Sequence, residues 1–146
     1  LRAAHLVRRL GELKDEDAAA YALVSNAYKL AKDTPEQVAA RDGAIQAALM
    51  TAAEVPLETA RWCAEVAQLA AFCAEKGNTN AASDAGVAAL LAEASCKGAA
   101  YNVRINAVAM PNKEAGAPLV AEALRFVSTA GEYARRATAA VEAQLV

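Results

Sequence analysis

Apolar residues recur three or four positions apart along most of the chain, which is the pattern of helices packed on one face. Leu6, Leu10 and Leu13 begin this pattern. No run alternates between apolar and polar residues as a half-buried strand does. The pattern predicts six helices. They are expected at about residues 1–13, 15–31 and 35–54, from just after Pro56 to residue 75, and at 83–110 and 115–145. Their short connections favour antiparallel neighbours in a helical bundle.

The boundaries between these helices are expected at acidic, proline or glycine positions. The acidic run 15–17 suits the positive end of a helix dipole, so a second helix is expected to start there. Thr34 and Gln37 have the spacing of a capping box at the start of the third. Pro56 is expected to interrupt that helix, because proline lacks the amide hydrogen that an inner turn needs. Gly77 is expected to end the fourth as a left-handed cap.

Composition supports an all-α domain over residues 1–146. Hydrophobic residues make up 56% of the chain and aromatic residues 5%. Alanine is abundant, and it both favours helix and lets neighbouring backbones approach closely. The high apolar content also fits burial between copies of the chain. Trp62 and Phe72 are expected to pack in the core.

Charge and cysteine usage narrow the function classes. A net charge of −2 with no basic cluster argues against nucleic acid as a partner. No uncharged apolar run is long enough to cross a membrane. Three scattered cysteines and one histidine form no metal-binding pattern, so no metal is expected. An odd number of unpaired cysteines fits a reducing compartment, and we expect the protein in the cytoplasm.

One face of the helix expected at 83–110 is unusually polar. Asp84 and Asn102 are five helical turns apart and face the same way, with Ser95 and Asn106 within about 40° of them. The two ends of this row lie roughly 27 Å apart. Either a long ligand or a second copy of the chain could lie along it. In a purely structural interpretation, Ser83 or Asp84 caps the helix and the two asparagines bridge neighbouring helices.

An ordered set of segments resembles the cyclodeaminase/cyclohydrolase family. This family contains the cyclodeaminase half of formiminotransferase-cyclodeaminase and the stand-alone methenyltetrahydrofolate cyclohydrolases. The segments are Asp17, Val55-Pro56-Leu57, Gly77-Asn78-Thr79-Asn80, Ser83-Asp84-Ala85-Gly86 and Asn102-Val103-Arg104-Ile105-Asn106. The resemblance implies an all-helical homodimer that binds tetrahydrofolate near the subunit interface, with no cofactor beyond this substrate. Family members usually carry a glycine-rich PGGGS-like segment near the N-terminus, which we expect to precede Leu1.

The reactions implied by this resemblance need an acid–base group and polar groups that hold the folate. A carboxylate can serve as general acid or base at the one-carbon bridge, and Asp84 is the first candidate. Asp17 is a second acidic candidate, although it could also cap a helix. Asn78, Asn80, Asn102, Asn106 and Ser83 are candidates to bind the substrate, because amides and hydroxyls both donate and accept hydrogen bonds. Arg104, with Lys97, could meet the glutamate carboxylates of the folate.

Several functional alternatives remain compatible with the sequence. Cyclohydrolysis of methenyltetrahydrofolate and ammonia-releasing cyclisation of formiminotetrahydrofolate demand similar groups on nearly the same ligand. A catalytically inactive protein that binds folate, or a purely structural helical dimer, is the alternative from another class.

Overall fold

Four long α-helices make up the structure, a computed structural model that describes residues 2–145. They are α1 (Arg2–Tyr28), α2 (Pro35–Lys76), α3 (Ala82–Ala109) and α4 (Ala117–Glu142). Short 3-10 helices, η1 (Thr79–Ala81) and η2 (Lys113–Gly116), precede α3 and α4. The described residues contain no β-strand. The predicted all-α class is therefore confirmed, whereas the predicted division into six helices is wrong.

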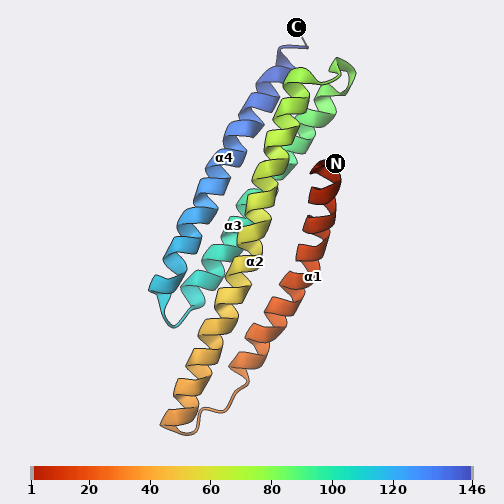
Figure 1. Cartoon of the computed structure of the whole chain (residues 1–146). Helices are drawn as coiled ribbons and strands as arrows, with labels where there is room; N and C mark the ends of the chain where they lie inside the picture. Colours follow the sequence, from red (N-terminus) through yellow and green to blue (C-terminus); the bar gives the residue numbers. More distant parts are fainter. Residues whose placement is uncertain (1, 146) are drawn as a thin grey trace.

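Helix α2 is the central element of the bundle. It packs against α1, α3 and α4, and α3 and α4 also pack against each other. Figure 1 shows α1 alongside α2 on the side away from α4, and the α1–α2 turn reaching past the α3–α4 turn. Because α1 packs chiefly against α2, the space between α1 and α3 is left open along part of its length.

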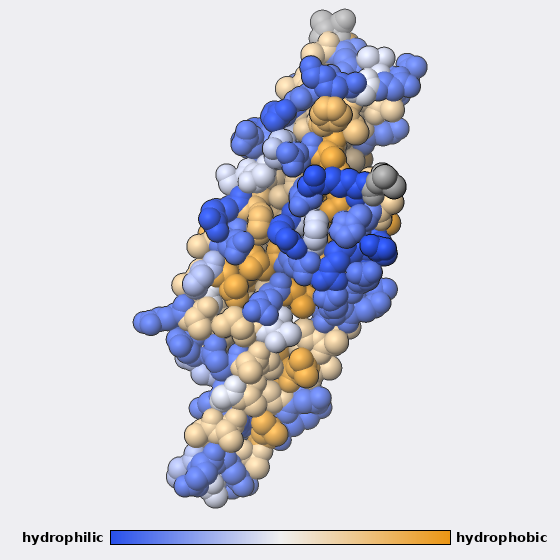
Figure 2. All heavy atoms as spheres, viewed as in Figure 1, coloured by the Kyte–Doolittle hydropathy of each residue, from blue (hydrophilic) through white to orange (hydrophobic). Residues whose placement is uncertain are grey.

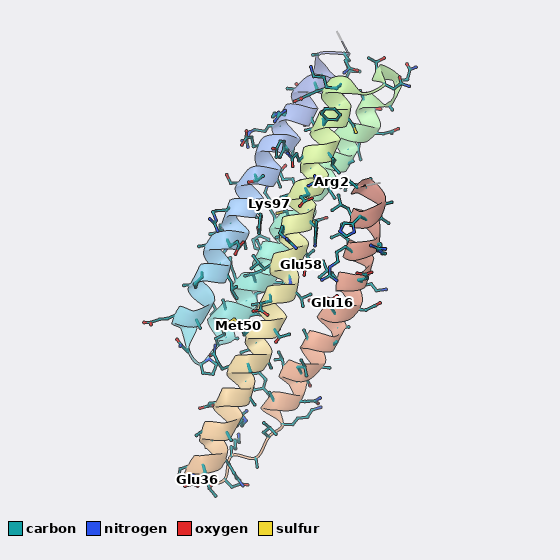
Figure 3. The ribbon with its side chains drawn as sticks, viewed as in Figure 1. Arg2, Glu16, Glu36, Met50, Glu58 and Lys97 are labelled. Carbon is teal, nitrogen blue, oxygen red and sulfur yellow. The ribbon has the colours of Figure 1, made fainter. Side chains whose placement is uncertain are left out.

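The acidic run 15–17 lies inside α1 and does not start a new helix. Glu16 accepts a hydrogen bond from Arg9, whose guanidinium also donates to Glu58 of α2, with Nη2 and Oε2 2.8 Å apart. Figure 3 shows Glu16 and Glu58 on the two neighbouring helices, and Figure 2 shows hydrophilic side chains gathered over this region. With no proline nearby and its charges on the surface, the segment continues as one helix.

The break predicted at Pro56 is also absent, because α2 runs through it without interruption. Proline cannot donate to the carbonyl of the residue four positions earlier, which here is Ala52. The side-chain amide of Asn106 on α3 donates to that carbonyl instead, at 2.7 Å. A hydrogen bond from another helix therefore replaces the one that the proline removes.

Both ends of α2 lie where the sequence predicts a helix end, but only the N-terminal end has the predicted cap geometry. Thr34 and Gln37 form the predicted capping box, each side chain accepting from the other's backbone amide. The helix ends at Lys76, and the amide of Gly77 donates to the carbonyl of Cys73 at 2.8 Å. Gly77 has φ −84° and ψ −164°. The predicted left-handed cap is therefore wrong, because extended backbone serves the same purpose here.

Small side chains dominate the core. Ala60, Ala64 and Ala67 of α2 pack with Cys96 of α3 and Ala130 of α4. Such residues let helix axes approach closely, which explains the alanine-rich composition. The two large aromatics behave differently from the prediction, since Trp62 is half-buried and Phe72 is 62% exposed. Between residues 2 and 145, no helix has both the length and the apolar character needed to cross a membrane.

Candidate functional site

Helices α1, α2 and α3 surround an open hollow of about 290 Å³, which we call the α1–α3 groove. Its lining comes from three separate parts of the chain: Leu10, Leu13, Lys14 and Asp17 of α1, Pro56 and Thr59 of α2, and Ser95, Gly98, Ala99 and Asn102 of α3. The volume is just below the usual range of about 300–1,000 Å³ for small-molecule sites. The structure thus brings together Asp17 and Asn102, which are candidates from distant segments of the sequence.

The lining of the α1–α3 groove combines apolar walls with a few polar groups. Asp17 and Lys14 lie three residues apart, on the same side of α1. Ser95 and Asn102 face the groove from α3. A carboxylate, an ammonium, a hydroxyl and an amide beside leucine, proline and alanine suit a flat ring with polar edges.

Asn102 and Asn106 are one turn apart on α3 but have different environments. The Nδ2 atom of Asn102 donates to the Gly98 carbonyl of its own helix at 3.3 Å, a long bond that a ligand can replace. Asn106 is half-buried, and its 2.7 Å bond to Ala52 joins α3 to α2. Asn102 therefore lies where it can meet a ligand, whereas Asn106 fixes α3 against α2.

The remaining amide candidates and Ser83 lie at the opposite end of α3. The side chain of Asn78 accepts from the backbone amide of Asn80 at 3.0 Å and so begins η1. Asn80 and Ser83 line a second hollow of about 420 Å³, which the C-terminal end of α4 also borders. These residues do not converge with the α1–α3 groove.

Asp84, the first catalytic candidate from the sequence, is in the first turn of α3 and exposed. The N-cap position of α3 is Ala81, with no side-chain hydrogen bond. The expectation that Ser83 or Asp84 caps this helix is therefore wrong. The rise of a helix puts Asp84 roughly 27 Å from Asn102 along α3, far from the α1–α3 groove.

The cations proposed for the folate carboxylates do not line the α1–α3 groove. Arg104 lies on the outer face of α3 beside Tyr101 and Ile105. Lys97 donates to Glu93 on its own helix at 2.7 Å. Lys14 is the lysine that lines the groove, and sequence reasoning missed it because a lysine on an exposed helix carries no distinguishing signal.

An ion-pair network fixes α1 onto α2 next to the groove. The hydrogen bond from Arg9 lowers the pKa of the Glu58 carboxyl to about 2. Trp62 also donates to Glu58, with Nε1 and Oε1 2.9 Å apart. Because Leu10 and Thr59 adjoin Arg9 and Glu58 in sequence, this network positions two of the residues that line the groove.

The two buried cysteines, Cys63 and Cys96, are not suited to nucleophilic chemistry. Burial raises the pKa of the Cys63 thiol to about 11 and that of Cys96 to about 12. Both thiols are therefore protonated, and so poorly nucleophilic, at neutral pH. Over the described part of the chain, no three histidine, cysteine or acidic side chains gather as metal ligands would.

Comparison with known proteins identifies the family. The family model described as formiminotransferase-cyclodeaminase matches residues 1–125. The chain belongs to this family. This membership confirms the resemblance inferred from the ordered sequence segments.

Individual relatives agree with the family assignment. The chain is 47% identical over 108 residues to a methenyltetrahydrofolate cyclohydrolase of Methylorubrum extorquens, covering 74% of this chain and 52% of that protein. It is 39% identical over 98 residues to the formimidoyltransferase-cyclodeaminase of Rattus norvegicus, covering 67% of this chain and 18% of that enzyme. The chain thus spans about half the length of the bacterial cyclohydrolase.

A solved structure shares the fold. The crystal structure of formiminotetrahydrofolate cyclodeaminase from Thermotoga maritima superposes with a TM-score of 0.79 at 27% sequence identity. The match covers 92% of this chain and 63% of that one. The arrangement of four helices is therefore that of a folate enzyme of the same family.

Proposed function

We propose that this protein is a folate one-carbon enzyme and that the one-carbon bridge of the folate lies in the α1–α3 groove. Family membership supports the substrate class. The single structural observation that carries the site is the meeting of Asp17 and Asn102 in one groove. The higher identity to a cyclohydrolase, 47% against 39% for the rat cyclodeaminase, favours hydrolysis of methenyltetrahydrofolate, with cyclodeamination as the second candidate.

In the hydrolytic reaction, water adds to the methenyl carbon that bridges two nitrogens of the folate. The carboxylate of Asp17 accepts the proton that the water loses. The bond from this carbon to one nitrogen then breaks, the new hydroxyl becomes a carbonyl as it loses its proton, and the freed nitrogen takes up a proton. The amide of Asn102 and the hydroxyl of Ser95 orient the water and the folate edge.

The same groups fit the ammonia-releasing reaction. The nitrogen that closes the new ring attacks the formimino carbon and loses its proton to a carboxylate, and the leaving nitrogen departs as ammonia after it is protonated. Lys14 lines the groove, where its ammonium group can bind an anionic part of the ligand. The negative charge of the Asp17 carboxylate is in a position to stabilise the positive charge of a methenyl bridge.

Asp84 is the competing candidate for the acid–base group. Since it lies roughly 27 Å along α3 from Asn102, one folate bridge cannot contact both residues within one copy of the chain. The proposal therefore assigns the proton transfer to Asp17. The other candidates from the sequence do not line the α1–α3 groove. They lie near Asp84 at the start of α3 (Asn78, Asn80 and Ser83) or on the outer face of α3 (Arg104). These residues therefore contact the one-carbon bridge only if the reaction takes place outside the groove.

The test compares Asp17→Asn with Asp84→Asn and follows the loss of methenyl absorbance. Loss of a general acid or base typically costs about 10²- to 10⁴-fold in rate. We expect this loss for Asp17→Asn, with folate still bound, and near-normal turnover for Asp84→Asn. Asp42→Asn, at an exposed position of α2, is the matched control.

Other outcomes point to the alternatives. If Asp84→Asn is inactive and Asp17→Asn is active, the reaction takes place at the other end of α3. If the unchanged protein binds reduced folate without turnover, it is a folate-binding protein that is not an enzyme. If it does not bind folate, the structural helical bundle is the better description.

The proposal includes a homodimer in the cytoplasm. The described structure leaves large apolar side chains exposed on α3, as expected for a surface that pairs with another copy. Cys63, Cys73 and Cys96 are all free thiols, which fits a reducing compartment.

A further inference from the structure

Helix α1 is the least enclosed wall of the α1–α3 groove. Of the four long helices, it alone packs chiefly against a single neighbour, which is α2. Its buried side chains form one row with a spacing of seven residues: Leu6, Leu13, Ala20 and Ala27. A single apolar row is a narrow contact surface, and half of this one is alanine. Other contacts must therefore set the rotation of α1 about its own axis.

The two flanks of this apolar row carry different residues. Viewed down the helix axis, Arg9 and Glu16 lie about 40° and 60° to one side of Leu13. Asp17 and Lys14 lie about 40° and 100° to the other side, where they line the groove. A rotation of α1 that moves the first flank therefore also moves the carboxylate of Asp17.

On the first flank, Arg9 joins α1 to α2 through a bidentate ion pair. Its Nε and Nη2 atoms donate to the two carboxylate oxygens of Glu58 on α2, at 3.0 and 2.8 Å. Nη2 also donates to Oε2 of Glu16, two turns further along α1, at 3.1 Å. The Arg9 side chain is 20% exposed, against 47% or more for the other cations that form ion pairs between residues 2 and 145. Solvent and salt therefore screen this pair less than the others.

A second ion pair has the same register. Arg2 lies nearer the start of α1 (Figure 3) and donates to Glu65 of α2, with Nη2 and Oε2 2.7 Å apart. Arg2 precedes Arg9 by seven residues, and Glu65 follows Glu58 by seven, so both pairs fit one antiparallel arrangement of the two helices. Two contacts on one flank, two helical turns apart, fix both the register and the rotation of α1 on α2.

We propose that Arg9 and Glu58 are positioning residues of the folate reaction, and that their ion pair turns the Asp17 carboxylate toward Asn102. This inference rests on the proposed function, in which Asp17 takes the proton. Neither Arg9 nor Glu58 lines the groove. Both residues therefore act through Asp17 and not by contact with the folate.

Helix geometry gives the size of the effect. Side-chain atoms lie about 5–6 Å from the helix axis, so a rotation of about 20° moves the Asp17 carboxylate by about 2 Å. A misplacement of about 1 Å can cost about 10²-fold in rate. Loss of the Arg9–Glu58 pair can therefore lower turnover strongly while α1 stays helical and packed on α2.

The first test compares Arg9→Gln with a matched ion pair elsewhere in the bundle. Arg136 of α4 donates to Glu75 of α2 through the same two atoms, Nε and Nη2, at 2.9 and 3.0 Å, away from the groove. We expect Arg9→Gln to lower kcat about 10- to 100-fold and Arg136→Gln to leave it at the parent value. Arg9→Lys keeps the charge without the bidentate geometry, so it should recover part of the loss.

Urea unfolding shows how far each of these variants is destabilised. Parental kcat in Arg9→Gln would overturn the proposal, as would an equal fall in Arg136→Gln.

The second test asks whether Arg9 acts through Asp17. If it does, Arg9→Gln combined with Asp17→Asn should turn over at the rate of Asp17→Asn alone, because the carboxylate that Arg9 positions is already gone. A general weakening of the fold would instead lower the rate of Asp17→Asn further. Losses that multiply in the double variant would therefore refute the positioning role.

The third test follows the position of α1 without any folate. Tyr21 of α1 and Leu124 of α4 are 73% and 50% exposed, so cysteines that replace them can carry spin labels in a Cys73→Ser background. The labelled protein is diluted with unlabelled protein, so that only distances within one copy are measured. We expect Arg9→Gln to shift or broaden the distance distribution by about 2 Å, as the rotation requires. We expect no change in Arg136→Gln, because α4 also packs against α3.

The spin-label distances separate this inference from the folate reaction. An unchanged distribution in Arg9→Gln would refute the positioning role whatever the protein does with folate. If the distribution shifts but the parent protein turns over no folate, the proposed function fails, while control of α1 by the ion pair stands.

Discussion

The hydrogen bond between Asn106 and the Ala52 carbonyl makes a testable prediction about stability. Ala52 is buried, and Pro56 has no amide hydrogen to offer its carbonyl. In Asn106→Ala this carbonyl loses its 2.7 Å donor and stays unpaired within the protein. An unsatisfied buried polar group costs about 1–3 kcal/mol, and the better helix propensity of alanine returns only a few tenths of this. We expect a net loss of about 1–2 kcal/mol in the free energy of unfolding.

The same reasoning predicts a dependence on Pro56 that can be measured as a double-mutant cycle. In Pro56→Ala the new backbone amide can donate to the Ala52 carbonyl, so Asn106 is no longer its only donor. Asn106→Ala should therefore cost less in the Pro56→Ala background than in the parent, with a coupling of about 0.5–3 kcal/mol. Urea unfolding followed by far-UV circular dichroism measures all four proteins.

Equal costs in the two backgrounds would refute this explanation of how α2 continues through its proline. Asn102→Ala is the matched control, because its 3.3 Å bond stays within its own helix at an exposed position. It should change stability by no more than about 0.5 kcal/mol. If Asn102 contacts the folate, this variant weakens folate binding without loss of stability.

Three further measurements test the packing, the ion pair and the thiols. An added Cβ at Gly116 would lie 2.6 Å from a methyl carbon of α3, so Gly116→Ala should lose about 1–3 kcal/mol of stability. Gly43→Ala, in an open part of α2, should gain up to about 1 kcal/mol in the same urea titration. The pKa of Glu58 is about 2 in the folded protein against an ordinary 4.5, so its contribution is complete above pH 4.5 and disappears as the pH falls toward 2. Glu58→Gln should therefore be less stable than the parent at pH 7, by roughly 1 kcal/mol for this partly exposed group, and equal to it near pH 2. A thiol reagent should modify the exposed Cys73 in the native protein, whereas Cys96, whose pKa burial raises to about 12, should react only after unfolding.

The sequence was sufficient to predict helical content and several helix ends, because these depend on local interactions. The capping box of Thr34 and Gln37 involves atoms three residues apart, and it forms as predicted. The ordered segments also identified the family, which the match over residues 1–125 confirms. A row of polar residues on α3 was visible as well, because helical spacing alone decides which side chains share a face.

The tertiary structure decided which of the predicted helix ends exist and which of the candidate site residues lie together. Pro56 does not end α2, because its missing hydrogen bond is replaced by Asn106, 50 residues further along the chain. Asp17 and Asn102 share a groove only because α1 and α3 both pack beside α2. Asp84, on the same row as Asn102, is excluded from that groove by the length of its own helix. Local spacing fixes the direction of a side chain, but its neighbours depend on how distant helices pack, and no single stretch of sequence contains that information.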